Sequence, residues 1–132
     1  MVGYQAVNQS NSRPSVLILG GGFAGISCAS SLSSRHFNVC LVDQKSHFEF
    51  LPNIHEILSG VKRPRDVRLD LAQQMSALQH RFVKASVEGI APEKKQVFLN
   101  NGTTLNYDYL VVGLGAIDAS YGVEGIEPNA FS

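Results

Sequence analysis

Three glycines and one aspartate have the types and spacing to bind an anionic nucleotide. Gly20, Gly22 and Gly25 lie in the run GGGFAG, and Asp43 follows roughly 20 residues later. The first glycine permits a tight turn, the second leaves room for a pyrophosphate, and the third lets a helix pack close to a strand. A carboxylate at Asp43 can accept hydrogen bonds from both hydroxyls of an adenosine ribose. The pattern predicts a dinucleotide site.

The elements around these residues fit that prediction. The apolar run 16–19 is typical of a parallel strand buried on both faces, and a helix is expected over 24–35 because Ile26, Ala29 and Leu32 recur at threefold spacing. The start of this helix would offer backbone N–H groups and a positive dipole end to phosphate. A second strand, 39–42, leads into the acid. The alternative is a plain tight turn with a solvated Asp43, and the acid itself argues against an NADP site.

The rest of the chain continues as a mixture of helices and strands. Helices are predicted at 53–59, with Pro52 in the first turn and Gly60 at the end, and at 69–79, where Leu71, Met75 and Leu78 share one face. A buried strand at 81–86 precedes a meander of short strands at 87–91, 96–99 and 103–106, with an Asn-Gly turn before the last. An apolar strand follows at 109–112. Residues 1–15 are predicted to be a mobile leader, and residues 117–132 to be loop-like.

Composition narrows the class of protein. The 132 residues carry a formal net charge of zero, which gives no electrostatic reason to expect nucleic acid. Cys28 and Cys40 are expected to be small buried apolar side chains, and their spacing predicts neither a redox disulfide nor a metal site. The chain shows no signal peptide and no apolar run near the ~20 residues of a membrane span. We therefore expect a cytoplasmic setting, and leave peripheral attachment to the inner face of a membrane open.

Two separated motifs carry a family resemblance. The segment GGGFAG, the Phe50-Leu51-Pro52 segment, the meander and the run YDYLVVGLG at 107–115 together resemble the pyridine nucleotide-disulfide oxidoreductase superfamily of flavoproteins. Within it, the chain looks most like type II NADH dehydrogenases and sulfide:quinone oxidoreductases, over residues 15–132. The resemblance implies an α/β fold in which a Rossmann-like parallel sheet has an inserted antiparallel β-meander. Residues 16–132 would then be the FAD-binding domain, without the NADH domain and the C-terminal segment.

The resemblance also implies roles for individual residues. Gly20, Gly22 and Gly25 would receive the pyrophosphate and Asp43 the ribose, while the backbone of Val87 would meet the adenine edge. The remaining cofactor-binding residues that it implies are Phe23, Ala24, Gln44, Lys45, Pro52 beside the isoalloxazine ring, Gly113 and Gly115. Gly113-Leu114-Gly115 stands where the family has Ala-Thr-Gly, so a hydroxyl is lost and the last glycine kept. His47 and His55 are interpreted as ordinary polar residues, and no catalytic residue is nominated.

The function that this resemblance implies is electron transfer from NADH through FAD to a quinone or another acceptor. No cysteine occurs in residues 44–60, which disfavours a disulfide reductase, a peroxidase or a CoA-disulfide reductase. Because no nicotinamide domain is present, we expect these residues alone to be inactive and the parent to be the enzyme. Peripheral association of the parent with a membrane stays open.

Two alternatives remain at this point. One is a fragment of a sulfide:quinone oxidoreductase. The other is a free-standing nucleotide-binding or interaction module without catalysis, as a homodimer whose partner covers a missing strand. A simple NAD-dependent Rossmann dehydrogenase is disfavoured, because the meander stands where that fold would continue with βα units.

Overall fold

The computed structural model describes residues 12–49 and 68–116. In chain order its elements are β1 (Ser15–Leu19), α1 (Phe23–Ser31), β2 (Asn38–Asp43), β3 (His47–Glu49), β4 (Arg68–Asp70), α3 (Leu71–Ala77), β5 (Arg81–Lys84), β6 (Val87–Ala91), the 3-10 turn η3 (Pro92–Lys94), β7 (Gln96–Leu99), β8 (Thr104–Asn106) and β9 (Tyr109–Val112). The expected Pro52, the helix at 53–59 with His55, and the segment 117–132 lie outside the described residues.

A four-stranded parallel sheet, in the order β5-β2-β1-β9, is the centre of the fold. Successive strands β1, β2 and β5 extend the sheet in one direction, and β9 then pairs with the other side of β1. The strand order therefore reverses between β1 and β9, at the place where open α/β sheets bind ligands beyond their carboxyl ends. The predicted Rossmann-like class is confirmed.

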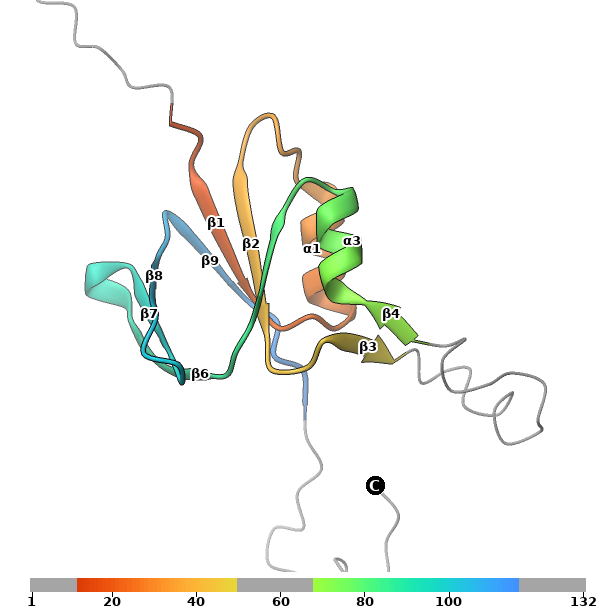
Figure 1. Cartoon of the computed structure of the whole chain (residues 1–132). Coiled ribbons are helices and arrows are strands. Elements are labelled where there is room, and N and C mark those ends of the chain that lie inside the picture. Colours follow the sequence, from red (N-terminus) through yellow and green to blue (C-terminus); the bar gives the residue numbers. More distant parts are fainter. Residues whose placement is uncertain (1–11, 50–67, 117–132) are drawn as a thin grey trace, which may run out of the picture.

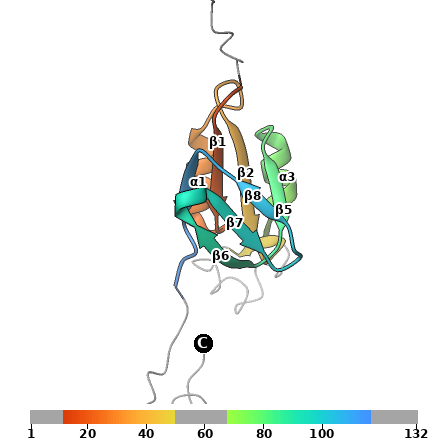
Figure 2. The same ribbon diagram turned by 90° about the vertical axis from the view of Figure 1, so that its left-hand side faces the viewer.

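Helices cover one face of this sheet and the meander covers the other, as Figures 1 and 2 show. Side chains alternate along β1, so that Val16 and Ile18 pack on the helix side while Leu17 and Leu19 pack on the meander side. All four are at most 5% exposed. Burial on both faces explains why this strand is an uninterrupted apolar run.

The inserted meander is also confirmed. β6, β7 and β8 pair in sequence as an antiparallel sheet, and Gly102 takes a positive φ of 78° in the predicted Asn-Gly turn. The earlier turn is a single 3-10 turn that closes at Lys95 in the left-handed region. Val97 and Leu99 of β7 are buried against the parallel sheet, so the meander occupies the place that a crossover helix has in a simple βα repeat.

Helix α1 is shorter than expected. It ends at Ser31, not near residue 35, and Leu32 is already extended. The buried imidazole of His80 explains the early end, because its Nε2 lies 3.0 Å from the carbonyl oxygens of both Ala29 and Leu32. Carbonyls that a longer helix would have bonded internally are bonded to a side chain from beyond α3.

The segment expected as one helix over 69–79 is instead a strand followed by a helix. β4 pairs with β3 as an antiparallel ribbon that sequence reasoning missed, with Leu69 opposite Phe48. Asp70 then caps α3, because its Oδ1 accepts a hydrogen bond from the Gln73 N–H at 2.8 Å. Leu71 and Met75 are fully buried beneath the helix, as predicted.

Three smaller expectations need correction. The strand predicted to be buried over 81–86 ends at Lys84 and is the edge of the sheet, so its end residues Arg81 and Lys84 are exposed. Cys28 and Cys40 are half-buried and not fully buried. The predicted leader ends early, because the Pro14 carbonyl accepts a hydrogen bond from the Asn38 N–H and Ser15 begins β1.

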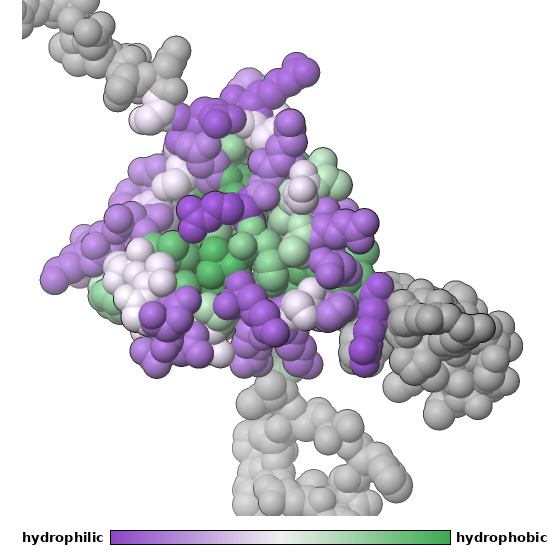
Figure 3. All heavy atoms as spheres, in the orientation of Figure 1, coloured by the Kyte–Doolittle hydropathy of each residue, from purple (hydrophilic) through white to green (hydrophobic). Residues whose placement is uncertain are grey.

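The surface in the orientation of Figure 1 is largely hydrophilic. Figure 3 shows hydrophilic residues around most of this face and a hydrophobic area near its centre. Neither helix of the described part is long and apolar enough to cross a membrane.

Candidate dinucleotide site

A hollow of about 270 Å³ lies at the carboxyl ends of the parallel strands. It is lined by residues at or just beyond the carboxyl ends of β1, β2, β5 and β9: Gly20, Val42, Asp43, Gln44, Ala85, Ser86, Val87 and Leu114. This edge is where the reversal of strand order predicts a ligand. Four of the residues that the sequence selected line this hollow: Gly20, Asp43, Gln44 and Val87.

The glycine turn needs glycines at its first and last positions for steric reasons. Gly20 has a φ of 103°, and a Cβ there would overlap the carbonyl oxygen of Gly113. Its N–H donates to the Val42 carbonyl at 2.8 Å, which joins the turn to β2. A Cβ on Gly25 would overlap the Gly20 carbonyl oxygen and lie 3.4 Å from Ile18 Cγ2. The predicted close packing of helix on strand is confirmed at Gly25.

Gly22 is different, because a Cβ there would meet no atom within 4 Å. It immediately precedes α1, and its carbonyl accepts the Ile26 N–H at 2.9 Å as the first turn of the helix forms. The opening turn of a helix presents N–H groups and a partial positive charge to the space beyond it. The start of α1 thus borders open space beside Gly22, and helix N-termini favour anionic groups.

The carboxylate of Asp43 is fixed against the glycine turn. Its Oδ2 accepts the Gly21 N–H at 2.6 Å, and its Oδ1 accepts the Lys45 N–H at 2.7 Å. Each carboxylate oxygen has a further lone pair, so both can still accept a hydroxyl hydrogen. The predicted ribose acceptor is therefore oriented before any ligand arrives.

The second glycine motif meets the first in space. The Gly113 N–H donates to the Leu19 carbonyl at 2.7 Å, and a Cβ on Gly113 would lie 3.5 Å from both Ala24 Cβ and the Gly25 nitrogen. Gly115 has a φ of 74° with open space where a Cβ would be. The two motifs are separated by about 90 positions in the sequence, and the parallel pairing of β1 with β9 brings them together on one surface.

The other predicted site residues surround this surface. Val87 and Gln44 line the hollow, and the Gln44 Oε1 accepts a hydrogen bond from the Ser86 hydroxyl at 3.4 Å. Lys45 and Ala24 are exposed. Phe23 is 58% exposed, and its ring meets that of Phe48 edge-on with centroids 4.8 Å apart.

Five residues at the site were missed by sequence reasoning. Val42, Ala85, Ser86 and Leu114 line the hollow, and each lies at or just beyond the end of a strand at this edge, which was the available signal. Gly21 touches Asp43 through its N–H, but the fingerprint treats its position as variable. Its contacts from other parts of the chain are visible only in the fold.

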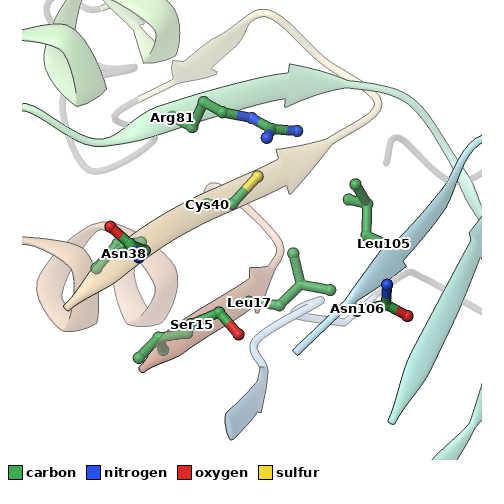
Figure 4. Close-up of a pocket in the computed structure, with 9 residues that line it drawn as sticks. Ser15, Leu17, Asn38, Cys40, Arg81, Leu105 and Asn106 are labelled. Carbon is green, nitrogen blue, oxygen red and sulfur yellow. The ribbon is translucent and has the colours of Figure 1, made fainter. Parts of the chain in front are cut away.

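A second, smaller hollow of about 140 Å³ opens at the opposite, amino-terminal ends of the strands (Figure 4). Cys40 and Arg81 lie opposite each other on β2 and β5, with Leu105 and Asn106 of β8 across from them. Burial raises the pKa of the Cys40 thiol, and the charge and hydrogen bond of Arg81 oppose that rise. Within the described residues, His, Cys, Asp and Glu side chains form no group of three that could hold a metal ion.

Comparison with known proteins gives consistent matches. The family model described as "Pyridine nucleotide-disulphide oxidoreductase" matches residues 14–132. A sulfide-quinone reductase from Aquifex aeolicus is 29% identical over 89% of this chain and 27% of its own length. A type II NADH:quinone oxidoreductase from Staphylococcus aureus is 29% identical over 92% of this chain and 31% of its own length. The chain thus spans less than a third of these relatives.

Solved structures agree with the fold. The sulfide:quinone oxidoreductase of Aquifex aeolicus matches with a TM-score of 0.79 and 28% identity, over 88% of this chain and 27% of that one. NDH2 from Plasmodium falciparum in complex with NADH matches with a TM-score of 0.78 and 18% identity, over 88% and 25% of the two chains. At that identity the second likeness supports the architecture alone.

Proposed function

The chain belongs to the pyridine nucleotide-disulphide oxidoreductase family, and from this premise we propose that residues 16–132 are the FAD-binding portion of an NADH dehydrogenase-like flavoprotein. The parent protein would pass electrons from NADH through FAD to a quinone or another acceptor. When bound, FAD supplies the hydride and electron chemistry, and the protein supplies orientation and electrostatics. The 29% identity to a type II NADH:quinone oxidoreductase supports this direction.

The single observation that carries the proposal is the open space at Gly22 beside an oriented carboxylate. A Cβ on Gly22 meets nothing within 4 Å, whereas one on Gly20 or Gly25 meets backbone. Steric contacts within the chain therefore explain Gly20 and Gly25, and a bound ligand would explain Gly22. The start of α1 faces the same space, which favours an anionic group such as a pyrophosphate.

Each part of the site has a task in this proposal. The N–H groups at the start of α1 and the turn at Gly22 hold the pyrophosphate, and Asp43 accepts the ribose hydroxyls. Val87, Gln44 and Ser86 border the hollow on the side where the adenine would lie. Gly113 and Gly115 let the end of β9 approach the pyrophosphate from the other side.

The test is the flavin content of the full-length protein. We expect a yellow protein with absorbance at about 450 nm, as flavins show in general, and NADH-dependent reduction of a quinone. Gly22→Val should lower FAD affinity by about 100-fold, because a branched side chain fills the space proposed for the pyrophosphate. Arg81→Met, in the hollow at the other end of the sheet, should leave FAD affinity unchanged.

Two results would contradict the proposed function. A colourless full-length protein that binds ADP or NAD would replace the flavoenzyme with a nucleotide-binding module. A yellow Gly22→Val variant with undiminished affinity would move the cofactor away from this turn.

The sulfide:quinone alternative has its own support in the relative from Aquifex aeolicus. The choice between the two depends on the electron donor. Cys28 lies on α1 and Cys40 in the hollow at the amino ends, so neither borders the candidate site. Reduction of the flavin by NADH and not by sulfide supports the NADH proposal, and the reverse result supports the alternative.

A further inference from the structure

We propose that Leu71 is a positioning residue of the cofactor site, and that any side chain at position 21 would displace Leu71 or the glycine turn. This inference rests on the proposed function and adds a residue far from the fingerprint in sequence. Leu71 opens α3 and is fully buried. A Cβ on Gly21 would lie 2.5 Å from Leu71 Cδ1, closer than real Cβ contacts come, and 3.3 Å from Asp43 Oδ2.

The contacts among these residues close a ring. Gly21 donates its N–H to Asp43 Oδ2 at 2.6 Å, and Lys45 donates to Oδ1 of the same carboxylate at 2.7 Å. The next residue, Ser46, accepts the Leu71 N–H at 3.0 Å through its carbonyl. The Leu71 side chain then returns to Gly21. These contacts hold the glycine turn, the Asp43 carboxylate and α3 in fixed positions relative to one another.

The position of Leu71 is itself well determined. Asp70 precedes it and caps α3, and β4 fixes the approach of the chain by pairing with β3. The ring therefore connects the glycine turn to the antiparallel ribbon of β3 and β4. A displaced Leu71 side chain would shift Gly21 and, through one hydrogen bond, the Asp43 carboxylate.

The surroundings that favour a glycine at position 21 therefore differ from those at position 22. At position 22 an added methyl group enters open space, while at position 21 it enters a side chain of the protein. A steric conflict inside the protein can be relieved by trimming the other partner. This gives the inference a rescue test that a conflict with a ligand would not allow.

The experiment measures the FAD dissociation constant and the melting temperature of the full-length protein and its variants. Gly21→Ala should raise the dissociation constant by about 10- to 100-fold, because the added methyl group moves the turn and Asp43. Adding Leu71→Ala should restore affinity to within about threefold of Leu71→Ala alone, since contacting sites are not additive. Should Leu71→Ala fold poorly, Leu71→Val provides a smaller relief in the same direction.

Met75 provides the matched control. It is as buried as Leu71, lies one turn further along α3 and belongs to the same core, but the three atoms nearest to a Cβ on Gly21 belong to Leu71 and Asp43. Gly21→Ala with Met75→Ala should therefore stay weak for FAD. Equal rescue by Met75→Ala, or a folded Gly21→Ala/Leu71→Ala variant as weak as Gly21→Ala, would overturn the inference.

The measurements distinguish a failure of the proposed function from a failure of the positioning role of Leu71. If the unmodified protein binds no FAD, the proposed function fails, and the same cycle measured with ADP still decides whether Leu71 positions the turn and Asp43. If FAD binds normally but the rescue is absent, the positioning role fails and the proposed function stands.

Discussion

The two ends of the parallel sheet each have a hollow, but they are built in different ways. At the carboxyl ends the chain supplies glycines, backbone N–H groups and one carboxylate, Asp43. At the amino ends side chains bond to the protein itself: Ser15 with Asp108, and Cys40 with Arg81. A hollow alone does not make a nucleotide site. Each oxygen of Asp43 accepts one hydrogen bond within the protein and can accept another, whereas Oδ2 of Asp108 already accepts two from Ser15.

Helix α1 shows the same contrast along its own axis. Its N-terminus faces the open space beside Gly22. Its C-terminus is closed by His80, whose Nε2 lies 3.0 Å from the carbonyls of Ala29 and Leu32. In the proposed site the positive end of the helix faces the ligand, while carbonyls at the negative end are bonded within the protein.

The largest effect should come from breaking the carboxyl end itself. Gly25→Ala should lower the free energy of unfolding by about 3 kcal/mol, because its Cβ would overlap the Gly20 carbonyl and force α1 away from β1. Urea denaturation followed by circular dichroism measures the change. Gly89→Ala is the control, since its Cβ would make an ordinary 3.7 Å contact with Phe98, and it should change stability by less than about 1 kcal/mol. Equal losses in the two variants would contradict the steric argument.

A moderate effect should appear at the amino end, where acid should loosen the contact between β1 and β9. The backbone N–H and hydroxyl of Ser15 hold the pKa of Asp108 below its ordinary value. The ionised carboxylate stabilises the fold above the unfolded-state pKa of about 3.9, and this contribution is lost as pH falls through the lowered folded-state pKa. Asp108→Asn should lower the melting temperature at neutral pH and flatten its fall on the acid side. An unchanged acid limb would assign the sensitivity to another carboxylate.

The smallest effect should be chemical and local. Because burial raises the Cys40 pKa and Arg81 opposes the rise, Arg81→Met should raise it further and slow alkylation by iodoacetamide near neutral pH by roughly two- to fivefold. Arg81→Lys keeps the charge and should lie between the two. Peptide mass spectrometry gives the rate at Cys40. Faster labelling in Arg81→Met would mean that the guanidinium shields the thiol more than it activates it.

Much of the fold could be predicted because it depends on local patterns. The buried strands 16–19 and 109–112, the glycine turn and the Asn-Gly hairpin each carry a signal within a few residues. The predictions were wrong where residues distant in the sequence determine the local structure. α1 ended early because His80 bonds its last carbonyls, and β4 formed because Phe48 and Leu69 pair across the ribbon.

The sequence by itself determined the ingredients of the site: three spaced glycines, an acid at the end of the second strand, and a second glycine motif after an apolar strand. It did so because these residues follow one another closely enough for turn and strand chemistry to dictate their order. Only the tertiary structure decided that Gly113 lies against Gly20, and that Leu71 lies beneath Gly21 in a ring with Asp43. Such contacts depend on the order of strands in the sheet and on side-chain volume, and neither is written in any short stretch of the chain.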